Sequence, residues 1–212
     1  YYVIKTVREP LILGTEVPQF LQALGIKSAA EVKTFAAAGQ ALVLMAFVPA
    51  YSWFASRVDR MKLIVGVTLF FAANILAFAV AVQAGVPFIG VAFYIWVGFF
   101  SLSIIAQFWS YANEIYTRPE GERLFPLIAI GSTAGAPLGA AAAARMFGHG
   151  RSPFLMMEIA AAFLLLHLVL YRVVAARMAS RSGRPAAEPI KAGNGFALVL
   201  RSPYLRLVAL LL

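Results

Sequence analysis

The chain has 212 residues, of which 62% are hydrophobic and 13% charged, and its formal net charge is +9. Soluble domains carry about 25% charged residues, so the composition excludes an ordinary soluble domain and predicts a membrane protein. The absence of cysteine excludes disulfides, thiolate metal sites and cysteine nucleophiles.

Apolar runs of about 20 residues, long enough to cross a bilayer as helices, recur along the chain. Residues 1–14 are too few to span, and we interpret them as a first helix whose beginning is missing. Five complete spans are predicted at residues 34–56, 63–84, 86–113, 124–147 and 153–174. A seventh begins at Tyr204 and stops at Leu212. The sequence therefore predicts an all-α, polytopic transmembrane helix bundle.

These runs divide the chain into three parts. Residues 1–177 form the predicted N-terminal six-helix transmembrane half, with its first helix truncated. Residues 178–203 are a basic linker among Ala, Gly and Pro, and residues 204–212 start the seventh transmembrane helix. We expect the six helices to pack as two inverted groups of three, as transporter halves often do.

Basic residues concentrate on one side of the predicted membrane. With the first helix entering from the cytoplasm, the inside connections hold Arg57, Arg60, Lys62, Arg118, Arg123 and the cluster from Arg172 to Arg206. The outside connections hold only Lys27, Lys33, Arg145 and Arg151. The positive-inside rule favours this orientation, which makes the linker cytoplasmic. Orientation and contact with anionic lipid explain the net charge, so we expect no nucleic-acid partner.

A run of polar residues shares one face at the end of the fourth predicted span. This polar lane consists of Ser103, Gln107, Ser110 and Glu114, spaced four, three and four residues apart, and Asn113 lies beside it. Polar side chains at membrane depth are expensive, so they usually meet a substrate, an ion or one another. Two interpretations stay open: a lane lining a central cavity, or a helix edge satisfied by neighbouring helices.

Three charged residues, Lys5, Arg8 and Glu9, share one face of the first helix. Glu9 can pair with either base, which leaves a surplus positive charge. A surplus cation inside a bundle indicates an anion site, with Arg as a bidentate clamp and Lys as a point charge. The alternative is that Glu114 or another acid supplies the missing negative charge.

The fifth predicted span carries small residues at regular steps. Gly131, Gly135 and Gly139 lie four residues apart, the pattern through which membrane helices approach closely. We expect this face to pack against a neighbouring helix. The run GSTAG lacks the Lys-Ser/Thr of a phosphate-binding P-loop, so it predicts packing and not phosphate binding.

The sequence shows no pattern typical of catalysis or metal binding. His149 and His167 lack ligand spacing, and neither an HExxH nor a GxSxG motif occurs. We therefore expect no metal, no cofactor and no enzyme activity.

Two features resemble known transporter families. The turn RVDRMK at 57–62 is similar to the loop signature of major-facilitator transporters, with Asp59 and Arg60 at its Asp-Arg core and Lys62 where a Gly is expected. YYVIKTVREPLIL and FWSYANEIYTRPEGERLFPLIAIGSTAGA resemble the ATP/ADP exchange carriers of plastids and intracellular bacteria and their bacterial relatives. Lys5 and Glu114 stand where that family has a lysine and a glutamate that matter for transport.

The resemblance implies a twelve-helix fold of two six-helix halves with alternating access to a nucleotide site between them. This chain would be the first half, with the missing second half as its partner, in a bacterial plasma (inner) membrane. The expected substrate is ATP, ADP or a similar phosphorylated anion. Lys5 and Arg8 would attract it, and Gln107, Asn113 and Glu114 would shape or gate the polar lane. Glu9 is a further expected substrate-binding residue, and Asp59 and Arg60 are the expected gating residues of the loop.

Other functions stay open at this stage. A transporter of an unrelated solute would have the same fold, and so would a membrane sensor or scaffold that does not transport. An intramembrane enzyme ranks last, because no acid–base pair or metal set is present in the sequence.

Overall fold

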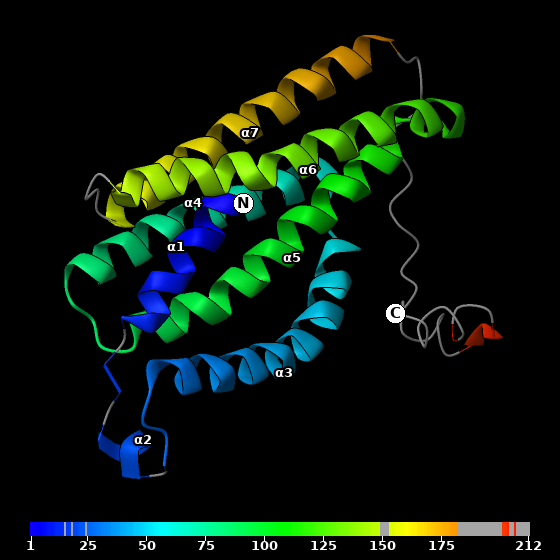
Figure 1. The fold of residues 1–212 in the computed structure, drawn as a ribbon. Helices are drawn as coiled ribbons and strands as arrows, with labels where there is room; N and C mark the ends of the chain where they lie inside the picture. Colours follow the sequence, from blue (N-terminus) through cyan, green and yellow to red (C-terminus); the bar gives the residue numbers. More distant parts are fainter. Residues whose placement is uncertain are drawn as a thin grey trace.

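The structure, a computed structural model, describes residues 1–14, 16–17, 19–23, 25–148, 153–181, 201–203 and 206. Its helices are α1 (Tyr2–Leu13), α2 (Gln19–Ala23), α3 (Ala29–Ala55), α4 (Arg60–Gln83), α5 (Ile89–Ile115), α6 (Arg118–Gly148) and α7 (Pro153–Arg181), shown in Figure 1. No strand occurs in this described part of the chain. The predicted all-α class is confirmed.

Five of these helices, α3 to α7, are long and apolar enough to cross a membrane. They coincide with the five complete spans predicted from run length, so the chain is a multi-pass membrane protein. α1 has 12 residues. α7 continues to Arg181, four residues past the predicted end of the six-helix half. Apart from 178–181, 201–203 and 206, the predicted linker and seventh helix lie outside the described residues.

Local signals explain where α3 and α4 begin. The Ser28 hydroxyl accepts from the Glu31 N–H, and the Glu31 carboxylate accepts from the Lys27 N–H, so α3 begins five residues before the predicted span. The Asp59 carboxylate accepts from the N–H groups of Met61 and Lys62 and caps α4.

The turn from α4 to α5 and the path of α3 also follow from the sequence. Gly85 and Phe88 adopt the left-handed conformation, with φ of 65° and 62°, in the short turn between α4 and α5. α3 follows a curved path (Figure 1) and contains Pro49, a residue type that bends helices.

The core forms where α1, α4, α5 and α7 meet. Large, deeply buried side chains come from three helices: Phe71 of α4, Phe93 and Phe100 of α5, and Met156 and Met157 of α7, all at most 3% exposed. α4 and α7 form the most extensive helix pair, and α1 packs against α5. The aromatic rings stack or meet edge to face, as apolar cores of this kind do.

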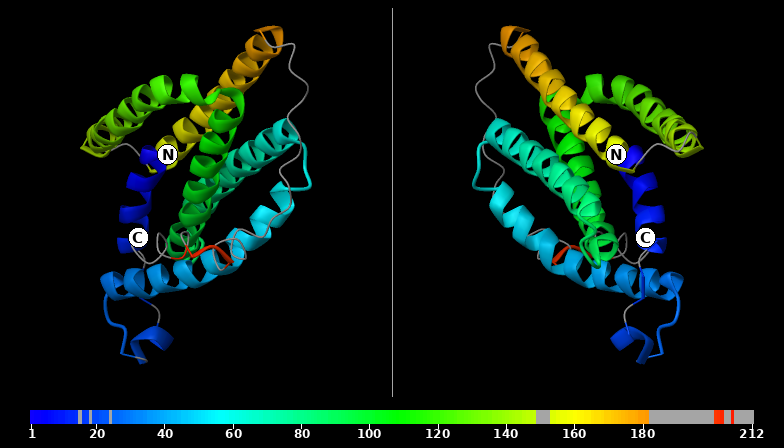
Figure 2. Two further views of the ribbon diagram at one scale, coloured as in Figure 1. Left: turned by 90° about the vertical axis from the view of Figure 1, so that its right-hand side faces the viewer. Right: turned by 90° about the vertical axis from the view of Figure 1, so that its left-hand side faces the viewer.

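α3 and α6 lie on the flanks of this core (Figure 2). Within their membrane-spanning windows only 6% of each helix is buried, against 39% for α4 and 44% for α5. α3 packs on α5 and α1, while α6 packs on α1 and slightly on α7. Both flanking helices therefore offer long apolar faces to whatever surrounds the bundle.

The helices fall into two sets with nearly the same packing partners. In this comparison α1 corresponds to α5, α3 to α6 and α4 to α7. α3 packs on α5 as α6 packs on α1, and α4 packs on α5 as α7 packs on α1. The remaining two large contacts, α1 with α5 and α4 with α7, each join two corresponding helices. The contacts of α1 with α3 and of α6 with α7 lack a counterpart of similar extent. With the short helix α2 left out, two successive sets of three helices thus have nearly matching packing partners.

Candidate functional site

A cleft of about 700 Å³ lies between α1 and α6. Its α1 wall consists of Tyr2, Lys5, Thr6, Glu9 and Pro10, and its α6 wall of Ala136, Ala140 and Ala144. The alanines leave room because their side chains are short, so α1 supplies all the polar groups. This cleft is the place in the described chain where residues predicted to bind substrate line an open space.

Lys5 is an exposed cation in this cleft. Its ammonium lies 5.9 Å from the centre of the Tyr1 ring, and no carboxylate among the described residues pairs with it. The charge of Lys5 is therefore not compensated within the described chain.

Glu9 joins α1 to α3. One carboxylate oxygen accepts from Arg8 Nη2 at 3.1 Å, and the other accepts from the Lys33 ammonium of α3. Glu9 therefore pairs with Arg8, as predicted, but its second cation is Lys33 and not Lys5. The interpretation of the sequence placed Lys33 in an outside connection, whereas the capped start of α3 includes it in the helix. Counting Lys5, this region has three cations against one carboxylate.

Arg8 connects the same region to α5. Its side chain is 15% exposed, and its guanidinium lies over the Tyr94 ring, 4.3 Å from the ring centre. Its buried Nε has no hydrogen-bond partner in the described chain. Arg8 is thus held by an aromatic face and one carboxylate.

Glu114 belongs to a second cluster, at the far end of α5. Its Oε2 accepts from Arg60 Nε at 2.8 Å, and the two side chains are 26% and 20% exposed. Tyr94, which contacts Arg8, lies twenty residues before Glu114 in α5, a rise of about 30 Å along a straight helix. The structure does not bring Glu114 together with Lys5 and Arg8, and Arg60 is the base that takes its charge.

Two residues of the polar lane of α5, Ser103 and Gln107, face the interior of the bundle. Gln107 is 5% exposed, and its Nε2 donates to the Tyr51 hydroxyl of α3 at 2.8 Å. Ser103 is fully buried, and Asn113 is exposed. For Gln107, the interpretation of a helix edge satisfied by neighbouring helices is confirmed. Ser103 of the lane instead lines a cavity between α3, α4 and α5, and its hydroxyl has no hydrogen-bond partner among the described residues.

The packing expected for the glycines of α6 occurs at one of the three. A Cβ added at Gly139 would meet Tyr2 Cβ of α1 at 2.8 Å, whereas nothing lies within 4 Å of such an atom at Gly131 or Gly135. The prediction is therefore right for Gly139 and wrong for Gly131 and Gly135 within the described chain. The physical reason is that α1 meets α6 at the level of Gly139, so the preceding turns of α6 have no described neighbour as close.

The second predicted motif, the turn between α3 and α4, has a structural role. The Asp59 side chain caps α4, and the Arg60 side chain forms an ion pair with Glu114. The two residues predicted to act in gating thus tie the turn to α4 and α5.

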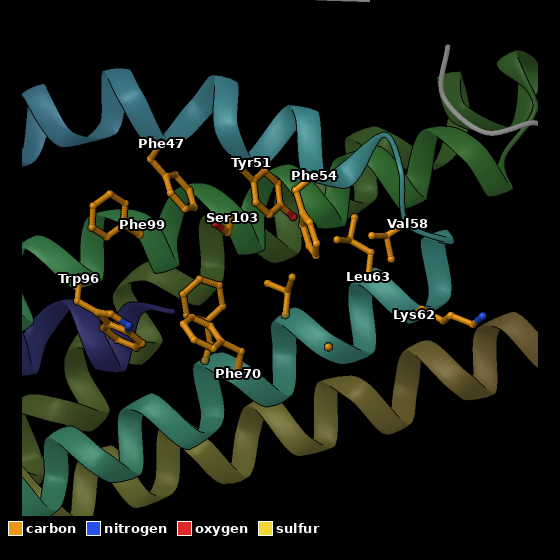
Figure 3. Close-up of a pocket in the computed structure, with 13 residues that line it drawn as sticks. Phe47, Tyr51, Phe54, Val58, Lys62, Leu63, Phe70, Trp96, Phe99 and Ser103 are labelled. Atoms are coloured by element: carbon orange, nitrogen blue, oxygen red, sulfur yellow. The ribbon is translucent and has the colours of Figure 1, made fainter. Parts of the chain in front are cut away.

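An apolar cavity of about 620 Å³ lies between α3, α4 and α5 (Figure 3). Its lining is mostly aromatic and aliphatic and includes Phe47, Tyr51, Phe54, Phe70, Trp96 and Phe99. The sequence interpretation missed it because it searched for polar residues at membrane depth. Phe47, Tyr51 and Phe54 follow one another at steps of four and three residues, a one-sided aromatic stripe that could have indicated it.

No group of three His, Asp or Glu side chains that could hold a metal ion occurs among the described residues. His167 of α7 stacks edge to face on Tyr171, with 4.6 Å between the ring centres. His149 lies outside the described residues.

The fold and these sites define a multi-pass, all-helical membrane protein with charged clusters near both ends of α5. Comparisons of the chain with family models, with curated proteins and with solved structures gave no match.

Proposed function

We propose that the protein is a secondary transporter of the major-facilitator-like kind. It exchanges ATP and ADP, or a similar phosphorylated anion, by alternating access. The observation that carries the proposal is Lys5, a cation without a carboxylate partner among the described residues that lines an open cleft between α1 and α6.

The charge balance supports an anionic substrate. An anion that crosses a bilayer must exchange its hydration for fixed positive groups and hydrogen-bond donors. Lys5, Arg8 and Lys33 stand against Glu9 alone, and Arg8 and Lys33 already share that carboxylate. Lys5 is the cation whose charge is available, and the hydroxyl of Thr6 lies in the same cleft.

The near-symmetric packing supports the transporter class. Repeats of three helices, nested in each six-helix half, are typical of major-facilitator transporters. Here the set α1, α3, α4 has nearly the same contacts as the set α5, α6, α7. The resemblance of the first helix and of the α5–α6 region to nucleotide exchange carriers agrees with this class.

Alternating access needs a second half against which the first can rock. The proposal therefore includes a further six-helix half, a bacterial plasma membrane as the site, and a cytoplasmic connection after α7. The sparsely buried faces of α3 and α6 are surfaces that such a half and the lipid would cover. Transport requires no covalent step, so no catalytic residue is assigned.

The experiment is exchange in liposomes that contain the full-length protein. Vesicles are loaded with ADP, and uptake of labelled ATP is compared with uptake into vesicles loaded with buffer. We expect uptake that depends on internal ADP, and a several-fold lower initial rate per molecule for Lys5→Gln. Lys27→Gln, an exposed lysine outside the cleft, is the matched control and should be unaffected.

Two results would contradict the proposal. Uptake of no nucleotide or other phosphorylated solute would leave the sensor or scaffold as the better interpretation. Uptake with equal rates for the parent and Lys5→Gln would remove Lys5 from the substrate path.

A further inference from the structure

The aromatic cavity between α3, α4 and α5 is separate from the cleft that contains Lys5. Phe54 and Phe70 line it and are 48% and 59% exposed, so the cavity opens toward the outside of the bundle, where the bilayer lies. Its volume of about 620 Å³ falls in the range of about 300–1,000 Å³ typical of ligand sites.

The walls suit a hydrocarbon chain. Three of the lining groups other than Lys62 could form hydrogen bonds: the Tyr51 and Ser103 hydroxyls and the Trp96 indole. The Tyr51 hydroxyl is already bonded to Gln107. The remainder of the lining offers aromatic faces and aliphatic side chains, so an acyl chain would lose little polar hydration there.

One end of the cavity is positively charged. Figure 3 shows Lys62 and Val58 at one end, with Phe47, Phe99 and Trp96 at the other. No carboxylate among the described residues pairs with Lys62, because Asp59 caps α4 and Glu114 pairs with Arg60.

The turn at this end contains a second cation, Arg57, which directly precedes the lining residue Val58. The Arg57 guanidinium lies over the Trp53 ring, 3.8 Å from its centre, and Trp53 is 62% exposed. Exposed Trp residues beside basic residues are typical of the boundary between acyl chains and headgroups. Lys62 and Arg57 are thus of the kind found at headgroup level, whereas the aromatic walls belong to the membrane-spanning helices α3, α4 and α5.

We propose that this cavity binds an anionic phospholipid from the leaflet that borders the α3–α4 turn. One acyl chain occupies the aromatic cavity, and the phosphate lies between Lys62 and Arg57. Basic pockets between membrane helices on the cytoplasmic side bind anionic headgroups in this manner. The proposal does not depend on the transported substrate.

Trp96, a lining residue that is 9% exposed, is a reporter inside the cavity. In the full-length protein every other tryptophan is replaced by Phe, and the protein is reconstituted into phosphatidylcholine vesicles. Phosphatidylglycerol with brominated chains, which quench tryptophan on contact, is then titrated in, and brominated phosphatidylcholine is titrated into a parallel sample. We expect the anionic lipid to quench Trp96 at the lower mole fraction.

Two substitutions separate the headgroup from the chain. Lys62→Gln should reduce the preference for the anionic lipid about fivefold, the factor for one basic residue at an anionic membrane surface, and retain quenching by both lipids. Gly66→Leu should abolish quenching by both lipids, because Gly66 lines the cavity and open space surrounds a Cβ added there. Gly66→Met provides a second blocking variant.

The controls match these changes. Gly39→Leu adds the same side chain at another open glycine that does not line the cavity, and Lys27→Gln removes a distant lysine. Neither should alter the quenching of Trp96, and circular dichroism checks the helical content of each variant.

Equal quenching of the parent by both lipids would overturn the proposal, and so would quenching that persists in Gly66→Leu and Gly66→Met. Absence of quenching by either lipid would show that another segment of the protein fills the cavity, which would overturn it as well.

Discussion

Arg60 Nε donates to Glu114 Oε2 over 2.8 Å, and each residue lies at a helix end where the dipole of its own helix disfavours its charge. Arg60 is the first residue of α4, at the positive end, and Glu114 is the next to last residue of α5, at the negative end. A charge at the unfavourable end of a helix lowers the stability by about 0.3–1 kcal/mol at an exposed site. The ion pair offsets this cost. A pair with Glu at position 60 and Arg at position 114 would avoid it, so stability alone does not explain why Arg is on α4 and Glu on α5.

Exchanging the two charges should therefore not destabilise the protein. We expect Arg60→Glu combined with Glu114→Arg to unfold at the same temperature as the parent or higher, since both helix dipoles then favour the pair. Each single change breaks the ion pair and opposes two like charges but relieves only one unfavourable helix end, so each single variant should be less stable than the double variant. Thermal unfolding in detergent measures this. A double variant less stable than either single variant would contradict the dipole argument.

The same double variant tests whether Glu114 acts in transport. If the exchanged pair is stable but exchanges nucleotide slowly per molecule, the charge at position 114 matters beyond its ion pair. Normal exchange would assign Glu114 to stability. Protein abundance in the membrane, measured beside the initial uptake rate, separates the two outcomes.

The hydrogen bond between Gln107 and Tyr51 should stabilise the contact of α5 with α3. Tyr51→Phe leaves the buried Gln107 amide without its acceptor and should cost about 0.6 kcal/mol and no more than about 1.7 kcal/mol, the average and the maximum found for hydrogen bonds between membrane helices. Adding Gln107→Leu should restore much of the loss, because no unsatisfied amide remains. A double-mutant cycle of unfolding free energies measures the coupling, and a value near zero would show that the bond contributes nothing.

The three glycines of α6 should differ in their tolerance of alanine. Gly139→Ala places a methyl 2.8 Å from Tyr2 Cβ, an atom fixed close to the backbone, and should destabilise by about 1–3 kcal/mol. Gly131→Ala and Gly135→Ala meet open space and should be neutral or stabilise by up to about 1 kcal/mol. Equal losses at all three, measured in the full-length protein, would indicate that another segment packs on Gly131 and Gly135.

Removing the charge of Glu9 should move stability and anion affinity in opposite directions. Glu9→Gln breaks the link between Arg8 and Lys33, at a cost of no more than about 1 kcal/mol because the pairs are partly exposed. The cleft then carries one negative charge fewer beside Lys5, so an anionic substrate should bind more tightly. Glu16→Gln is the control. Weaker binding of the anion by Glu9→Gln would contradict the assigned charge balance.

The sequence predicted the spans well because their length and hydrophobicity are local properties. The sequence also carries a signal for the start of α3, because Ser28 and Glu31 have the spacing of a capping box. The predicted start was based only on the length of the apolar run, so it came five residues too late. Helical spacing correctly placed Ser103 and Gln107 on one face. The sequence could not show which helices that face contacts. In the structure α3 and α4 lie against it, and this follows from how the helices pack and not from local spacing.

The ion pairs were the least predictable part of the candidate site. Glu9 and Lys33 are 24 residues apart, and Arg60 and Glu114 are 54 apart. Every carboxylate in such a sequence has several bases within plausible reach, and only the packing of the helices selects one. The grouping of Lys5, Arg8 and Glu114 rested on their charge in or beside the spans and, for Lys5 and Glu114, on the resemblance to the exchange carriers. The length of α5 separates Glu114 from the other two.

The pairing of α4 with α7 determines how the protein can be assembled as it is synthesised. α4 ends at Gln83 and α7 runs from Pro153 to Arg181, so at about 5–20 residues per second a ribosome needs about 5–20 s to complete the second helix. During that time the buried side of α4 can meet α5, whose Trp96 and Phe100 contact Phe71, but α7 is still absent. Lipid chains are as apolar as these side chains, so α4 can remain in the bilayer without aggregating. The core is completed when α7 inserts and packs against α4.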